Sequence, residues 1–114
     1  MTRRSFLQAS PAFAAGTDTP RAFLERCLAE IEAREGQVKA FVETAIPTAR
    51  QAADDATARW KAGRALSTID GMPIGVKDVI ETKDMPTGMG SPLFTGWRSG
   101  RDAASVKALR EAGA

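Results

Sequence analysis

The sequence predicts an α/β protein whose elements run in the order helix, helix, strand, loop, helix. Three observations favour this class. Apolar residues recur at helical spacing in two stretches, a short β-favouring run follows around Ile74, and a third helical pattern comes after a glycine-rich loop. With 114 residues the chain is long enough for one small domain.

The first strong helix begins at Thr19-Pro20. Thr19 is a good N-cap, and Pro20 suits the first turn because an N–H there would have no helical partner. Gly36 is the expected stop. Cys27 lies on the apolar stripe, so we interpret it as a small core residue rather than a reactive thiol. The stripe consists of Phe23, Leu24, Cys27, Leu28 and Ile31.

Two more helices follow. After a short extended piece, Val38 to Val42, the second helix begins near Pro47 and ends by Gly63. The last helix runs from Asp102, its expected N-cap, to about Glu111, with Gly113 as its stop. The buried face of the second helix is predicted to be Ala49, Ala52, Ala53, Ala56 and Trp60, and that of the last helix Ala103, Val106 and Leu109.

Between these helices, residues 73–80 predict a short buried strand. Gly75 inside it indicates that another backbone or a ligand approaches closely. Residues 85–92 have the glycines and prolines of a loop with special backbone angles. The apolar residues of the strand are Ile74, Val76, Val79 and Ile80.

Composition excludes several classes of function. The net charge is +2 and the basic residues are scattered, which disfavours a nucleic-acid partner. The chain has no histidine, so it cannot supply a histidine-based catalytic triad or a histidine-ligated zinc site. Its one cysteine cannot form an internal disulfide, and no apolar run reaches the ~20 residues that span a bilayer. We expect no metal and no cofactor.

The N-terminus has two interpretations. Residues 2–8 resemble a twin-arginine export signal through Arg3-Arg4, and Ala12-Phe13-Ala14 resembles its cleavage site. The stretch between them is a poor apolar region, because Gln8 and Pro11 interrupt it. We therefore expect residues 1–9 to be a basic tail and the protein to be cytoplasmic, with export as the alternative.

The candidate catalytic residue is Lys77, which follows apolar, β-favouring positions. A buried lysine has a lowered pKa, and the neutral amine can act as a general base. The plainer interpretation is a strand-end lysine with its amine in water or paired with Asp78. A phosphate-binding loop is disfavoured, because Gly71 and Gly75 are separated by three residues rather than four and an aspartate follows the lysine.

At this point the sequence resembles the lysine segment of the amidase-signature family. The resemblance covers residues 10 to 114 and rests on the order and spacing of several short motifs rather than on any one. The strings that carry it are Gly71-Met72-Pro73-Ile74-Gly75-Val76-Lys77-Asp78-Val79-Ile80, Thr82-Lys83-Asp84-Met85-Pro86-Thr87, Gly90-Ser91-Pro92, Asp102-Ala103-Ala104 and Leu109-Arg110-Glu111-Ala112-Gly113-Ala114, with Gly16-Thr17-Asp18-Thr19-Pro20 and Cys27-Leu28-Ala29-Glu30-Ile31-Glu32 before them.

The resemblance implies the N-terminal part of an α/β/α fold around a mixed sheet. It also implies hydrolysis of a carboxylic amide through a Ser–cis-Ser–Lys triad, of which this chain holds only the lysine, Lys77. The family's two serines belong to a segment expected downstream of residue 114, so we expect the chain to be truncated and inactive alone. Ser91 is interpreted as a loop-shaping residue.

Two alternatives stay open: a non-catalytic remnant or interaction fragment of the fold, and the amidase component of a tRNA-dependent amidotransferase. Nothing within residues 1–114 discriminates the remnant from the enzyme. The expected partner is a small-molecule amide substrate, with neither nucleic acid nor membrane bound directly. A homo-oligomer stays open.

Overall fold

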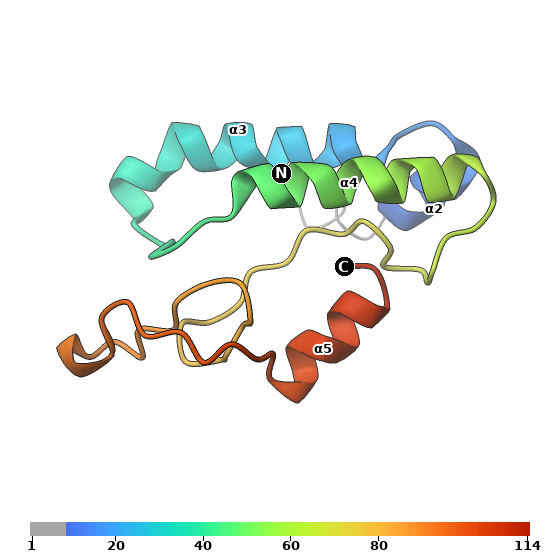
Figure 1. Cartoon of the computed structure of the whole chain (residues 1–114). Coiled ribbons are helices and arrows are strands. Elements are labelled where there is room, and N and C mark those ends of the chain that lie inside the picture. The colour runs from blue at the N-terminus through green and yellow to red at the C-terminus, as the bar shows by residue number, and fades with distance from the viewer. Residues whose placement is uncertain (1–8) are drawn as a thin grey trace.

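The computed structural model describes residues 9–114, which form four α-helices and one short 3-10 helix and contain no strand. Helices α3 (Pro20–Val38) and α4 (Ile46–Lys61) lie side by side and run in opposite directions, with α2 (Ala9–Ala15) packed at one end (Figure 1). Below them an extended segment leads into a loop region, which contains η1 (Pro92–Phe94) and ends in α5 (Ala104–Glu111). Arg3-Arg4 lies outside the described residues.

Helix α3 begins where the sequence predicts. The side chain of Thr19 accepts a hydrogen bond from the Ala22 N–H at 3.1 Å, and Pro20 occupies the first turn. The predicted stop at Gly36 is wrong, because the helix continues to Val38. A glycine inside a helix costs only about 1 kcal/mol. The helix ends instead at Lys39, which adopts the left-handed conformation (φ 52°) and donates its N–H to Glu35 at 2.8 Å.

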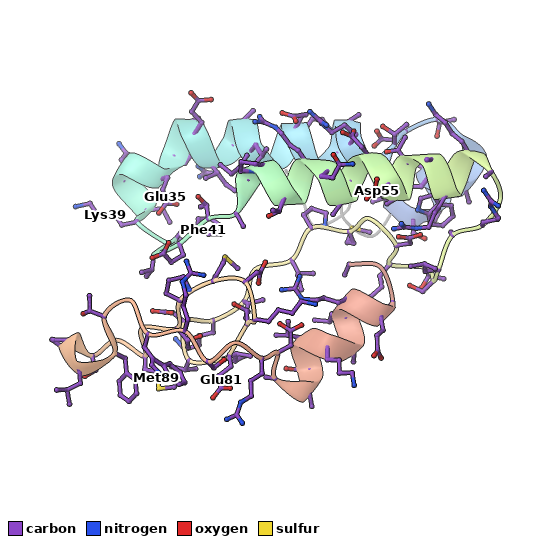
Figure 2. All side chains as sticks on the ribbon, viewed as in Figure 1. Glu35, Lys39, Phe41, Asp55, Glu81 and Met89 are labelled. Carbon is purple, nitrogen blue, oxygen red and sulfur yellow. The ribbon has the colours of Figure 1, made fainter. Side chains whose placement is uncertain are left out.

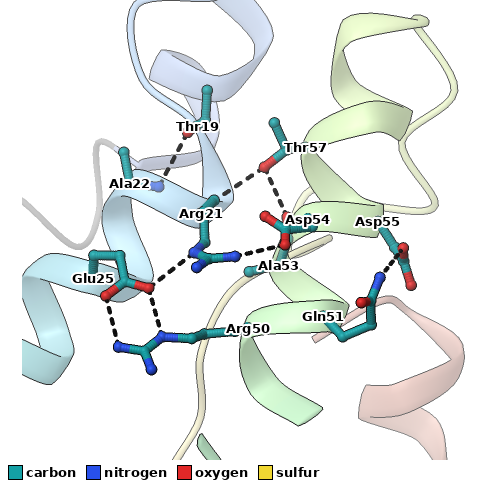
Figure 3. Close-up of polar contacts among 10 residues, drawn as sticks. All are labelled: Thr19, Arg21, Ala22, Glu25, Arg50, Gln51, Ala53, Asp54, Asp55 and Thr57. Atoms are coloured by element: carbon teal, nitrogen blue, oxygen red, sulfur yellow. Dashed lines mark hydrogen bonds and ion pairs between the residues drawn. The ribbon is translucent and has the colours of Figure 1, made fainter. Parts of the chain in front are cut away.

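Helix α4 packs on α3 through small side chains. Ala53 and Ala56 are buried as predicted, whereas Ala52 is exposed and Trp60 is half-buried. Alanines let the two helix axes approach closely. Figure 3 shows the polar contacts at one edge of this pair: Arg21 bonds Asp54 and Glu25, and Arg50 bonds Glu25 at 2.8 Å. Mainly because Arg50 donates to it, the pKa of the Glu25 carboxyl falls to about 2.

The hydrophobic core lies between α2, α3, α4 and the start of the extended segment. The Phe13 ring meets the rings of Phe23 and Trp60 edge-on, with centroids 6.0 and 5.9 Å apart. Cys27 packs half-buried against this core, and burial raises the pKa of its thiol, as expected for an inert core cysteine. The fully buried members are Ala9, Phe13, Phe23 and Met72.

The predicted strand at residues 73–80 is wrong for the described part of the chain. Residues 72–77 are extended, but a strand needs a neighbour for its ladder of hydrogen bonds, and no segment of residues 9–114 supplies one. Ile74 and Val79 are therefore 43% and 51% exposed. The expected extended piece at residues 38–42 forms no strand either, and the expected mixed sheet is not part of residues 9–114.

The predicted N-cap of the last helix is also wrong. Helix α5 begins at Ala104, and its N-cap is Ala103, without a side-chain bond. Asp102 instead accepts the N–H of Lys83 at 2.8 Å and an Arg110 N–H at 2.9 Å, so its carboxylate is used by tertiary partners. Val106 is buried and Gly113 has positive φ, as expected.

None of the helices in residues 9–114 combines the length and apolar character that crossing a bilayer would require.

Candidate active site

The segment that carries Lys77 leaves the helical pair at Gly71, where the packing admits no side chain. Gly71 has φ +79° and donates its N–H to Gly113 at 2.8 Å. A Cβ atom placed on it would lie 2.5 Å from the Cβ of Pro20 and 2.8 Å from that of Ala56, well inside van der Waals contact. This close approach fixes the point and the direction in which the segment begins.

Just before Gly71, Asp70 is a buried aspartate whose carboxylate accepts several hydrogen bonds. Its side chain is completely buried and accepts two bonds from Arg59, at 2.8 and 2.6 Å, and one from the Leu66 N–H at 2.9 Å. Burial opposes ionisation of this carboxyl, but these bonds together outweigh burial, so its pKa lies below the ordinary value. The Trp60 indole N–H also donates to the Asp70 carbonyl, at 2.9 Å.

Lys77 itself lies on the surface of the chain. It opens a tight turn in which the Ile80 N–H donates to the Lys77 carbonyl at 2.9 Å. Its side chain is exposed, and it forms no ion pair with any residue of the described part. The pairing with Asp78 considered from sequence is therefore not observed. The burial that base chemistry requires is not provided by residues 9–114.

Asp78 binds the next turn of the loop. Its Oδ1 accepts the Gly88 N–H at 2.8 Å, and its carbonyl accepts the Met89 N–H at 2.8 Å. Met89 and Gly90 both have positive φ, +56° and +66°. The Ser91 N–H closes this turn on the Gly88 carbonyl at 3.1 Å. Two bonds thus join the lysine turn to the Gly88–Ser91 turn.

Ser91 has the loop-shaping position that the sequence suggested. Its hydroxyl accepts the Leu93 N–H at 3.3 Å and caps η1. Thr87 was not singled out from sequence, yet it is only 1% exposed and its N–H donates to Trp97 at 2.9 Å. Its hydroxyl has no hydrogen-bond partner among the described residues. A lone threonine in a loop carries no signal of this kind.

Ion pairs form within the loop region and between that region and α5. Arg101 bonds Glu81 at 2.6 Å, and this bond is the main reason that the pKa of Glu81 lies below its usual value. Arg110 on α5 bonds both Asp84, at 2.6 Å, and Asp102. In Figure 2, Glu81 and Met89 both belong to this region, which lies below the α3–α4 pair in the view. Residues 9–114 contain no cluster of three or more His, Cys, Asp or Glu side chains that could hold a metal ion.

Comparisons with known proteins point in one direction. A family model described as Amidase matches residues 22–114. The A subunit of glutamyl-tRNA(Gln) amidotransferase from Chloroflexus aggregans (strain MD-66 / DSM 9485) is 41% identical over 116 residues, which cover 99% of this chain and 24% of that protein. The protein of the same name from Anaeromyxobacter sp. (strain K) is 36% identical over 114 residues, which cover 100% of this chain and 23% of that protein.

The fold is matched as well. An inhibitor-bound solved structure, of a vestigial protein complex that reveals the evolutionary origins of an s-triazine catabolic enzyme, aligns with a TM-score of 0.87 at 29% identity. The alignment covers 94% of this chain and 24% of that chain. This chain therefore spans about a quarter of the length of the proteins it matches.

Proposed function

Because this chain belongs to the amidase family, we propose that it is the lysine-bearing part of an enzyme that hydrolyses a carboxylic amide, with Lys77 as the general base. The observation that carries the proposal is the family match over residues 22–114, which contains Lys77 within the string from Gly71 to Ile80. The rigid exit at Gly71 and the hydrogen-bonded turn at Lys77 support it, because a base must be held in a fixed place.

In the proposed mechanism a neutral lysine amine takes a proton from a bridging serine, which takes one from the nucleophilic serine. The nucleophile attacks the amide carbonyl, the amine leaves with a proton, and water later hydrolyses the acyl-enzyme. A lysine is neutral near pH 7 only when it is desolvated, because its reference pKa is about 10.4. Under this proposal, both serines and the residues that bury Lys77 belong to the other three quarters of an amidase-length protein. This chain does not include those three quarters.

The test is Lys77→Ala in the full-length gene product, or in a graft of this segment onto a serine-bearing remainder. Loss of a general base usually lowers the rate ~10²–10⁴-fold. Lys77→Arg should not restore activity, because arginine stays protonated. Lys83→Ala, another exposed lysine six residues on, is the matched control and should keep its activity. Retention of more than about a tenth of the wild-type rate by Lys77→Ala contradicts the assignment. The 114-residue chain alone should be inactive.

A second candidate is the amidase component of a tRNA-dependent amidotransferase. The observation that favours it is that both relatives named above are described as the A subunit of glutamyl-tRNA(Gln) amidotransferase. Such a component would work together with protein partners. Purification of the tagged full-length protein from its own host discriminates the two: copurifying subunits and amidation that requires tRNA favour the transferase, and amide hydrolysis by the single polypeptide favours the amidase.

We also propose that the protein keeps its N-terminus and acts in the cytoplasm. Phe13 is 3% exposed and touches two aromatic rings of the core, so cleavage after Ala14 would remove a core side chain. The mass of the intact protein from its own host tests this proposal. A mature form that begins near Ala15 contradicts it.

A further inference from the structure

We propose that Asp78 is a positioning residue that holds the Lys77 turn and the Gly88–Ser91 turn together as one rigid unit of the site. This inference rests on the proposed amidase function.

Two hydrogen bonds connect Asp78 to the Gly88–Ser91 turn. Asp78 holds the second turn at two points, through its Oδ1 to Gly88 and through its carbonyl to Met89, both at 2.8 Å. One bond would leave the two turns free to pivot about it. Two bonds from one residue to consecutive N–H groups restrict both their distance and their relative orientation. The bonded residues are ten and eleven positions apart, so this contact is tertiary rather than local.

Gly88 packs closely against the Asp78 carboxylate. A Cβ atom on Gly88 would lie 2.9 Å from Oδ2 of Asp78 and 3.7 Å from its Cγ. The carboxylate therefore occupies the space that any other residue would need for its side chain. Met89 has positive φ although it is not a glycine, a conformation that persists where surrounding contacts enforce it.

Lys77 precedes Asp78 in the chain but is not its partner. Here the carboxylate is bound to Gly88, and Lys77 forms no ion pair within residues 9–114. Asp78 thus binds the second turn rather than the Lys77 amine.

The contact itself can be tested in the 114-residue chain. Only Gly88 and Gly96 follow a threonine, so ¹³C-carbonyl threonine combined with ¹⁵N-glycine in cell-free synthesis selects two amide signals. An N–H bonded to a carboxylate resonates downfield. Asp78→Ala should shift the Gly88 signal upfield and leave Gly96 in place. If both signals stay unchanged, the contact does not exist and the inference is overturned.

The positioning role is tested by kinetics in the full-length enzyme. Asp78→Ala should lower kcat about 10²-fold per active site titrated with an acylating inhibitor, with KM little changed, because misplacement of a catalytic group by about 1 Å has this effect. Asp78→Asn keeps an acceptor oxygen for Gly88 and should recover most of the loss. Asp84→Ala, which removes a carboxylate bound to Arg110 instead, is the control.

The outcomes separate this inference from the function it rests on. A wild-type kcat per titrated site in Asp78→Ala, together with an inactive Lys77→Ala, overturns the positioning role and leaves the amidase assignment standing. A lower titrated fraction with unchanged kcat per site indicates a purely structural residue and also overturns it. Unchanged activity in Lys77→Ala overturns the proposed function itself.

Discussion

Residues 9–70 and residues 71–103 of the same chain are stabilised in different ways. The first region buries aromatic rings between three helices, and most of the core comes from it. The second region has little apolar burial and is held by hydrogen bonds and ion pairs such as Asp78–Gly88 and Arg101–Glu81. Only Met72 among its large apolar side chains is buried, and four of them are exposed: Ile74, Val79, Leu93 and Trp97.

This difference in stabilisation agrees with the different roles proposed for the two regions. Apolar burial is non-directional and tolerates small shifts, so it suits a scaffold. Hydrogen bonds define distances and angles, so they suit a region that, under the proposed function, places a lysine beside other groups. Their net contribution to stability is only about 0.5–1.5 kcal/mol each, however. We therefore expect residues 71–103 to open locally more often than the α3–α4 pair.

The largest effect should come from the core. Phe23→Ala should lower the free energy of unfolding by ~3–5 kcal/mol, because Phe23 is 2% exposed and its removal leaves a cavity beside Phe13. Leu93→Ala in the loop region should change it by less than ~0.5 kcal/mol, since Leu93 is 91% exposed. Urea unfolding followed by circular dichroism measures both. Equal effects of the two substitutions would mean that the contrast between the regions is wrong.

The junction between the regions should be almost as sensitive. Gly71→Ala should cost ~2–4 kcal/mol, because it combines overpacking against Pro20 and Ala56 with a left-handed backbone. Gly63→Ala is the matched control: it also has positive φ, +67°, but no atom within 4 Å of the added Cβ, so only ~1–2 kcal/mol is expected. Thermal melts of both variants give the comparison. A Gly71→Ala protein as stable as Gly63→Ala would exclude the close approach.

Acid should weaken the hydrogen bonds and ion pairs that the carboxylates form. The pKa of Asp70 is lowered in the folded state, so its contribution is fully present above the unfolded pKa of about 3.9 and is lost as pH falls through the folded value. Glu81 and Asp102 have pKa values shifted in the same direction. Asp70→Asn should cost about 2 kcal/mol at pH 7 and make stability less dependent on pH below about 4. Urea midpoints between about pH 7 and 3 test this. An unchanged slope would show that Asp70 does not contribute to it.

The smallest effect concerns the unpaired hydroxyl of Thr87. Thr87→Val keeps the shape of the side chain and removes a buried group without a partner in the described chain, so it should raise stability by ~1 kcal/mol. Thr57→Val should lower it by a similar amount, because the Thr57 hydroxyl donates to Ala53 at 2.7 Å and accepts from Arg21 at 3.2 Å. Urea unfolding of the two variants should give opposite signs. Destabilisation by Thr87→Val would indicate that its hydroxyl has a partner.

The sequence by itself determined three of the four α-helices of the described residues, α3, α4 and α5, because a helix is specified by residues three and four positions apart; α2 was not predicted. The cap at Thr19-Pro20, the stripe through Cys27 and the alanine face around Ala53 were all readable in this way. The ordered motifs around Lys77 also identified the family. Each of these features depends on local spacing or on the order of short strings.

The tertiary structure alone decided which partners the polar groups bind. It also decided whether an extended segment pairs with a neighbour to form a strand. Asp102 bonds Lys83 rather than capping α5, Asp78 bonds Gly88 rather than Lys77, and residues 73–80 have no neighbouring strand in the described chain. A carboxylate or a free strand edge takes whichever donor the folded chain brings within about 3 Å, and that donor is often ten or more residues away. Sequence spacing carries no record of such distances.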